Sequence, residues 1–176
     1  AREQGILAGL SVFRGGFAAE AAEAVAGATL RDLARLMDRS LVMRRESGRY
    51  DLHDLLREYA SLKLRASPDG DEAARERLVG YLTRRLERWE EVLYGPRQGQ
   101  VVAEVEQELG NLTAGWEWAL ARGHSGWLAG AAESLGRLEI TRFPFQIRIP
   151  WGETAEALRG WVADKRAQGP GAWLIE

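Results

Sequence analysis

Two neighbouring residues, His53 and Asp54, combine the side-chain types in this chain that are best suited to chemistry. An imidazole can donate a hydrogen bond to an anion or exchange a proton near neutral pH. The pair stands where a short apolar run meets an amphipathic stretch, which is where a helix begins. Two interpretations follow: either the His53 ring bonds to backbone and Asp54 is the N-cap of the helix, or His53 faces a ligand. Because capping is common at such junctions, the residues alone favour the first.

Other patterns of catalytic or metal-binding residues do not occur in the sequence. The chain has no cysteine, and its second histidine, His124, lies far from His53, so neither a thiolate site nor a histidine cluster is expected. No GxxxxGK[ST], GxSxG or HExxH motif is present. The carboxylates stand beside arginines on helices, as Glu87, Glu90 and Glu91 do, which is typical of solvated i, i+4 pairs. We therefore expect no enzyme activity and no bound metal.

The segment that carries the pair, residues 41–64, predicts a strand, a turn, a second strand and a helix. Residues 41–43 are apolar, residues 46–48 (Glu-Ser-Gly) supply turn chemistry, and residues 50–52 form the returning strand. The helix begins at Asp54. We expect three of its apolar residues, at helical spacing, to face the core: Leu55, Tyr59 and Leu62.

Three short helices are expected before this segment, in residues 1–10, 18–26 and 29–38, separated by glycine-containing turns. Three helices, a β-hairpin and a further helix follow one another in the order of a winged helix. The sequence Pro-Asp-Gly at 68–70 predicts the end of this unit. Residues 1–66 are therefore predicted to be a winged-helix domain.

The second half of the chain changes to long helices. Apolar stripes predict helices over residues 71–94 and 100–122, and a third helix after Ser125. Short connections make such helices pack antiparallel, so residues 67–140 are predicted to be a helical linker domain. Residues 141–176, which begin with a proline-containing alternating stretch, predict an extended linker and the start of a tetratricopeptide-like repeat. The fold class is thus mainly α.

Composition limits the partners and the compartment. The chain has 176 residues, 45% of them apolar, and a formal net charge of −2, which gives no strong attraction to nucleic acid or to an acidic membrane surface. No apolar run approaches the roughly 20 residues that span a bilayer. The first residues are polar, without a signal peptide or an initiator methionine. We expect a fragment of a larger cytoplasmic protein.

Three stretches resemble a known family. LHDLLREYASLKL at 52–64 resembles the Met-His-Asp stretch in the winged-helix domain of NB-ARC-type signal-transducing ATPases (the STAND class), with Leu52 in place of methionine. LSVFRGGFAAEAAEAV at 10–25 and LARLMDRSLVMRRESGRYDLHDLLREYA at 33–60 resemble the same domain in bacterial AfsR-like and LuxR-type members. LGNLTAGWEWAL at 109–120 is similar to the segment that leads into their repeats. The resemblance covers about residues 5–135 and departs at residues 143–150.

The resemblance implies a regulatory role without catalysis. In relatives, the motif histidine reaches the β-phosphate of bound ADP and holds the closed, resting state, a role that would fall to His53, with Asp54 capping the following helix. The implied partners are the chain's own nucleotide-binding domain, which carries ADP or ATP with Mg²⁺, and a protein or small-molecule signal sensed through the repeats. The family's phosphate loop, Mg²⁺ ligand and sensor arginine do not occur in these 176 residues. We therefore expect no measurable nucleotide binding and no cofactor in this fragment alone.

Two alternatives remain open on the sequence: a DNA-binding winged helix in a transcriptional regulator, and a helical scaffold for protein–protein interaction. A DNA reader normally presents a basic surface on its recognition helix. The candidate helix over residues 29–38 instead balances two arginines with two aspartates, and the hairpin offsets three arginines with two carboxylates. These residues are Arg31, Arg35, Asp32 and Asp38 in the helix, and Arg44, Arg45, Arg49, Glu46 and Asp51 in the hairpin. The balanced charge of the helix and the hairpin therefore argues against DNA as a partner.

Overall fold

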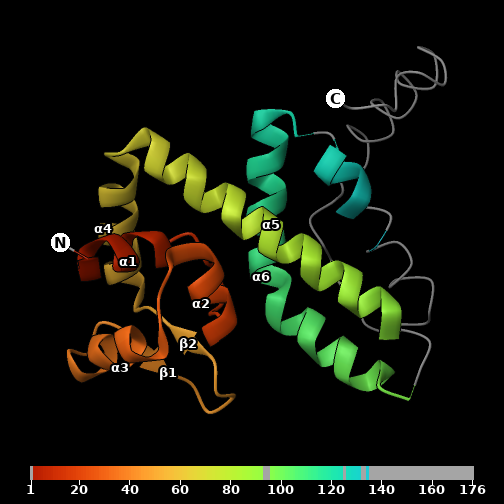
Figure 1. Cartoon of the computed structure of the whole chain (residues 1–176), viewed down its shortest axis with the longest axis horizontal. Coiled ribbons are helices and arrows are strands. Elements are labelled where there is room, and N and C mark those ends of the chain that lie inside the picture. Colours follow the sequence, from red (N-terminus) through yellow and green to blue (C-terminus); the bar gives the residue numbers. More distant parts are fainter. Residues whose placement is uncertain (1, 93–95, 125, 132–133, 135–176) are drawn as a thin grey trace. The chain divides into compact units, whose positions relative to one another are not determined.

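The structure is a computed structural model that describes residues 2–92, 96–124, 126–131 and 134. It is mainly helical with one small antiparallel sheet, which confirms the predicted class (Figure 1). The predicted linker and repeat over residues 141–176 lie outside the described residues. In chain order the elements are α1 (Arg2–Leu10), α2 (Ala19–Ala26), α3 (Leu30–Asp38), β1 (Met43–Arg44), β2 (Tyr50–Asp51), α4 (Asp54–Arg65), α5 (Pro68–Val92) and α6 (Gln98–Arg122).

The hairpin is short and is extended by a third segment. Met43 pairs with Asp51 and Arg44 with Tyr50, and Gly48, at φ +80°, provides the left-handed turn between the strands. On its other side Tyr50 forms an antiparallel bridge with Phe17 through two backbone hydrogen bonds of 2.8 Å. The loop before α2 is thereby fixed to the hairpin.

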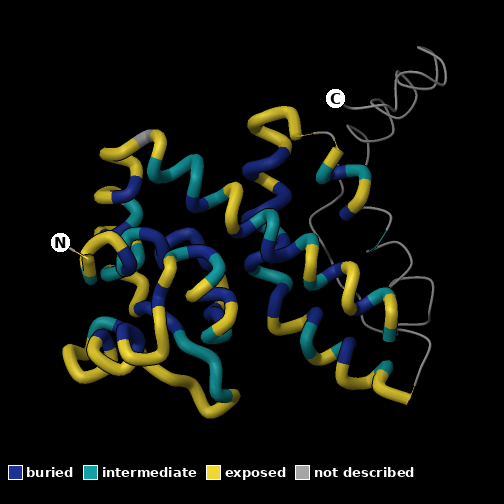
Figure 2. Tube along the Cα trace, in the orientation of Figure 1, coloured by how far each residue is buried: buried dark blue, intermediate teal, exposed yellow. Residues whose placement is uncertain are grey.

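Aromatic and aliphatic side chains fill the core beneath α1, α2 and the hairpin. Phe13 and Phe17 are almost fully buried and stack with ring centroids 4.9 Å apart. Leu10 of α1 and Val25 of α2 are completely buried. Figure 2 shows the buried stretches where α1 meets α2 and along the seam between α5 and α6. Burial on this scale provides the main stabilisation of the N-terminal part.

Helix α3 begins with a complete capping box, although the third residue is aspartate rather than glutamate. The Thr29 hydroxyl accepts a hydrogen bond from the Asp32 N–H, and Asp32 Oδ2 accepts one from the Thr29 N–H at 3.0 Å. Arg2 of α1 adds a 3.0 Å ion pair to the same oxygen. The Arg2 guanidinium, followed by the hydroxyl and N–H of Thr29, holds the pKa of the Asp32 carboxyl well below its usual range.

Replacing Asp32 with asparagine should therefore lower the melting temperature by a few degrees at pH 7, because the cap and the ion pair need the ionised carboxylate. The folded-state pKa is lowered, so this contribution is complete above the unfolded value of about 3.9 and is lost as the pH falls through the folded value. The difference between the two proteins should shrink below about pH 4. Thermal unfolding followed by circular dichroism checks this, with Asp38→Asn, at the exposed end of α3, as the control. An equal loss at all pH values would contradict it.

The predicted core face of α4 is wrong. Its three expected core residues, Leu55, Tyr59 and Leu62, are 73%, 55% and 60% exposed. Helix α4 instead turns Ala60 and Leu64 inward, where α4 packs against α1. The small Ala60 lets the helices approach closely, which the larger side chains on the neighbouring face would prevent.

The two long helices pack antiparallel, as predicted. Contacts from successive turns of α5 meet α6 in reverse order: Glu72 pairs with Arg122 at 2.8 Å, and Arg85 pairs with Glu104 at 2.6 Å. Between them, α6 presents Gly115 toward Leu82, and a Cβ at this glycine would lie 3.0 Å from a Leu82 methyl. The predicted stripes are largely buried, namely Leu78, Leu82, Leu86 and Trp89 of α5 and Val101, Val105, Leu112 and Trp116 of α6.

The boundary between the halves differs from the prediction. Pro68, expected in a closing loop, is the first residue of α5, a position where the missing N–H of proline loses no helical bond. The described residues of both halves belong to one compact unit, because α5 packs against α2 and α4 as well as against α6. None of the described helices is long and apolar enough to cross a membrane.

Candidate functional site

The structure leaves the His53 side chain free for a partner. His53 is the N-cap residue of α4, with extended backbone at φ −61° and ψ 140°. Its ring is exposed and makes no capping hydrogen bond, and its backbone carbonyl accepts the Arg57 N–H at 2.9 Å. The interpretation in which the His53 ring bonds to the local backbone is therefore wrong.

Asp54 is not the N-cap that the sequence suggested. It is the first helical residue, its side chain is 93% exposed, and it accepts a 3.1 Å hydrogen bond from Arg57 Nη1. A carboxylate in the first turn still interacts favourably with the positive end of the helix dipole. Asp54 thus contributes to the start of α4 by charge, while no described side chain caps this helix.

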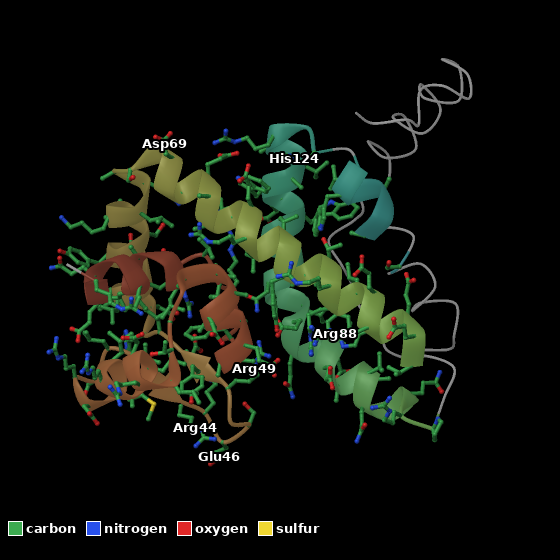
Figure 3. All side chains as sticks on the ribbon, in the orientation of Figure 1. Arg44, Glu46, Arg49, Asp69, Arg88 and His124 are labelled. Carbon is green, nitrogen blue, oxygen red and sulfur yellow. The ribbon has the colours of Figure 1, made fainter. Side chains whose placement is uncertain are left out.

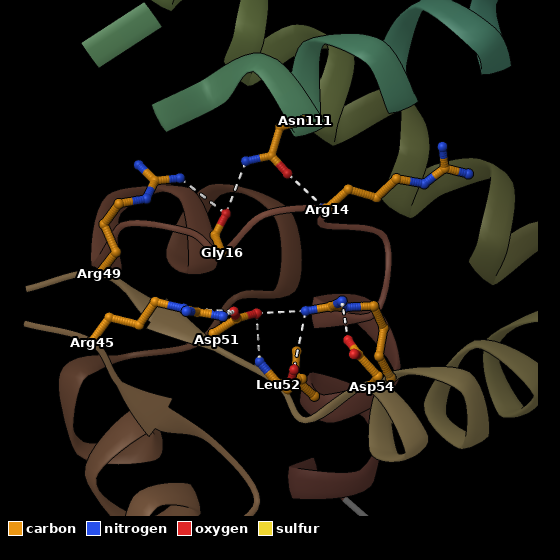
Figure 4. A network of polar contacts seen from close by, with 9 residues as sticks. Arg14, Gly16, Arg45, Arg49, Asp51, Leu52, Asp54 and Asn111 are labelled. Atoms are coloured by element: carbon orange, nitrogen blue, oxygen red, sulfur yellow. Dashed lines mark hydrogen bonds and ion pairs between the residues drawn. The ribbon is translucent and has the colours of Figure 1, made fainter. Parts of the chain in front are cut away.

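Asp51 fixes the backbone on which His53 stands (Figure 4). This carboxylate is buried at the end of β2. It accepts hydrogen bonds from Arg45 Nε at 2.8 Å and from the Leu52 N–H at 2.9 Å, and it forms an ion pair with Arg57 of α4. The hairpin and the first turn of α4 are therefore joined on both sides of the junction.

Beyond His53, α4 carries an exposed apolar ridge, which we define as Leu55, Tyr59 and Leu62. These residues recur at spacings of four and three, so they line one side of the helix. Large apolar side chains that share one exposed face are a mark of an interaction site. A histidine without a described partner thus precedes a helix that carries an exposed apolar ridge.

A second cluster joins the loop before α2 to α6. Gly15 and Gly16 lie in the left-handed region, at φ +87° and +85°, which suits glycine. The Gly16 carbonyl accepts hydrogen bonds from Arg49 Nη2 at 3.0 Å and from Asn111 Nδ2 at 2.9 Å (Figure 4). Asn111 Oδ1 in turn accepts the Arg14 N–H at 2.7 Å. The paired glycines therefore hold a carbonyl toward α6 and form no phosphate cradle.

Glu108 is the charged centre of this cluster. It is fully buried on α6, receives Arg49 Nη1 at 2.7 Å, and accepts Asn111 Nδ2 at 2.6 Å. Both partners leave little of its charge unsatisfied, as burial of a carboxylate requires. Figure 3 shows Arg49 near α6, whereas Arg44 and Glu46 lie at the far end of the hairpin.

The surroundings of Glu108 exclude water. Burial raises the pKa of the Tyr81 phenol above its ordinary value, and the charge of Glu108 raises it further. The Tyr81 hydroxyl has no hydrogen-bond partner among the described residues. Hydrogen bonds and ion pairs in such a dry environment are stronger than at the surface.

Sequence reasoning missed Glu108, Asn111 and the role of Asp51. One signal was present, because Glu108 stands three residues after Val105 and four before Leu112, inside the apolar stripe of α6. A carboxylate on a buried stripe needs a cationic partner. The sequence does not indicate which of its 24 lysines and arginines that is.

Comparison of the chain with protein-family models, with curated proteins and with solved structures gives no match. No group of three or more potential ligands that could hold a metal ion occurs among the described residues. The functional argument therefore rests on the site itself.

Proposed function

We propose that this chain is a non-catalytic regulatory part of a STAND-class ATPase, in which a winged helix couples the nucleotide state to a helical sensor. The observation that carries the proposal is the exposed His53 side chain, at a junction that Asp51 ties to α4 and before the helix that carries the apolar ridge. In this role His53 donates a hydrogen bond to a phosphate oxygen of ADP bound by another domain. A contact made in one conformation alone biases a two-state equilibrium.

The fit to ADP is limited to that one donor. The chain contains no phosphate loop, and at the glycine pair 15 and 16 the Gly16 carbonyl accepts hydrogen bonds from Arg49 and Asn111. The nucleotide must therefore be held by the nucleotide-binding domain, and the apolar ridge supplies a surface on which that domain can pack. The order of α1, the Phe17 bridge, α2, α3, the hairpin and α4 supports the winged-helix part of the proposal.

The hairpin cluster supports a coupling role over a DNA-binding role. Two of the three hairpin arginines are paired with buried carboxylates, the exposed Arg45 with Asp51 and the largely buried Arg49 with Glu108. Arg44 contacts the Gly48 carbonyl. Engaged arginines are not available to neutralise phosphates, which is the main source of affinity for DNA. Arg49 instead joins the hairpin to α6, while Arg57 of α4 pairs with the hairpin residue Asp51.

In the protein that joins this chain to its nucleotide-binding domain, His53→Ala should release ADP about tenfold faster or more, because a hydrogen bond to a charged group is lost. It should also shift the population toward the active, oligomeric state. Release of a fluorescent ADP analogue and size-exclusion chromatography measure the two effects. His124→Ala is the matched control, since His124 is exposed and stacks on Trp118 of α6.

Two outcomes would contradict the proposal. One is unchanged ADP release and oligomer size in His53→Ala. The other is tight ADP binding by the 176-residue chain alone, which would place the whole nucleotide site in this chain. A salt-dependent shift of duplex DNA at micromolar protein would favour the DNA-binding alternative instead.

A further inference from the structure

A groove between α1, α4 and the start of α5 shares only Tyr59 with the site of the proposed function. Its volume is about 600 Å³, which is within the range of small-molecule sites. Gly9, Ala60 and Leu64, all buried, form its deepest part. The groove is therefore a preformed hollow with an apolar floor.

Small residues of α1 leave free space along one wall of the groove. Gly5 and Ala8 line it, and a Cβ built at Gly5 would meet no atom within 4 Å. At Gly9, by contrast, a Cβ would lie 3.0 Å from the Ala26 side chain, so this glycine serves helix packing. The free space is thus on the Gly5 side of α1.

The charged side chains that line the groove are both positive. Lys63 and Arg77 line the groove, and none of its described lining residues is a carboxylate. The Lys63 ammonium lies 5.3 Å from the Tyr59 ring centroid, and Arg77 Nε donates to the Val25 carbonyl at 2.7 Å. Neither cation forms an ion pair with a carboxylate of the described residues. Their charge is therefore available to an anion in the groove.

We propose that this groove binds a small amphiphilic anion, with an apolar body against Gly5, Ala8 and Ala60 and one carboxylate or phosphate paired with Lys63 and Arg77. Apolar contact supplies the affinity, and the two cations select the sign of the head group. The inference does not rest on the proposed function, since the groove shares only Tyr59 with the apolar ridge and no residue with the His53 junction or the Glu108 cluster.

The test uses the 176-residue chain, labelled with ¹⁵N, and four probes: octanoate, octyl phosphate, octyltrimethylammonium and inorganic phosphate. The two octyl anions should shift the amide signals of Gly5, Gly9 and Gly70, which line the groove. Gly99 and Gly115 of α6 report on unspecific binding. Comparing the affinities of octanoate and octyl phosphate shows whether the groove prefers a carboxylate or a phosphate head group.

Two pairs of variants sharpen the test. Lys63→Glu should weaken binding of the octyl anions about tenfold or more, whereas Arg65→Glu, the same charge change on α4 outside the groove, should not. Gly5→Leu should abolish the shifts by filling the free space, and Gly99→Leu, at an equally open helical glycine of α6, should leave them intact. Both leucines favour the helix over glycine, so these variants should fold.

Several results would overturn the proposal. Equal binding of octyltrimethylammonium would show that charge does not select the ligand. Equal shifts at Gly99 and Gly115, or no shifts at the groove glycines, would show that no site exists there. Groove signals that move with protein concentration, together with a dimer in size-exclusion chromatography, would assign the groove to a second copy of the chain.

Discussion

Replacing Glu108 with alanine is expected to lower the free energy of unfolding by about 3–5 kcal/mol. The change leaves Arg49, whose side chain is 11% exposed, without its carboxylate in a region that excludes water. It also removes the 2.6 Å hydrogen bond from Asn111. The loss of a buried partner is far more costly than the loss of a surface charge. Urea-induced unfolding measures the difference.

The control for this prediction lies on the same helix. Glu106 is exposed, and Glu106→Ala should change stability by no more than about 0.5 kcal/mol. The double variant Arg49→Met with Glu108→Leu should recover much of the loss, because it removes both charges and keeps the volume. If Glu108→Ala behaved like Glu106→Ala, the buried cluster would not contribute to stability.

Gly110→Ala is expected to destabilise the chain by about 1–3 kcal/mol, because the added methyl group has no space. A Cβ at Gly110 would lie 2.3 Å from the Arg14 carbonyl oxygen and 2.9 Å from its carbon. Both are backbone atoms, so the contact cannot be relieved by a change of rotamer. The loop that holds Arg14 and Gly16 would have to move away from α6. Thermal or urea unfolding measures the cost.

The same substitution at Gly99 provides a control with the opposite sign. Gly99 also lies in α6, but a Cβ there would meet nothing within 4 Å. Gly99→Ala should therefore stabilise the chain by up to about 1 kcal/mol, because alanine loses less backbone entropy than glycine on folding. A stabilising effect at Gly110 would show that the loop is not packed closely on α6.

The succession of helices and the hairpin followed from local patterns in the sequence. Apolar spacing, capping residues and glycines act over a few residues, so the order from α1 to α6 could be predicted. The face of α4 that packs against the core could not be predicted in this way. Its sequence carries two apolar stripes, one with Leu55, Tyr59 and Leu62 and one with Leu56, Ala60 and Leu64. Packing of Ala60 against α1 determines the orientation, and this depends on the shape of a distant helix.

The sequence singled out His53 as a candidate, but it favoured a ring bonded to the local backbone, which the structure does not show. The exposed position of His53 agrees with an external partner, while its contact with a nucleotide stays a prediction. Arg49 was interpreted as a hairpin charge balanced by nearby acids, whereas its partner Glu108 lies 59 residues further along the chain. Spacing patterns carry no information on such distant pairs, because they are formed only when the elements pack.

The close approach at Gly110 also determines how α6 can move. Gly110 stands twelve residues from either end of α6. The helix therefore extends about 18 Å in each direction from the point where the loop contacts it. The contact between the loop and Gly110 is thus the point about which α6 would tilt. A tilt of about 10° about this point would carry the two ends roughly 3 Å in opposite directions. Such a tilt would strain the ion pairs with α5 on both sides of Gly110, at Glu104 and at Arg122.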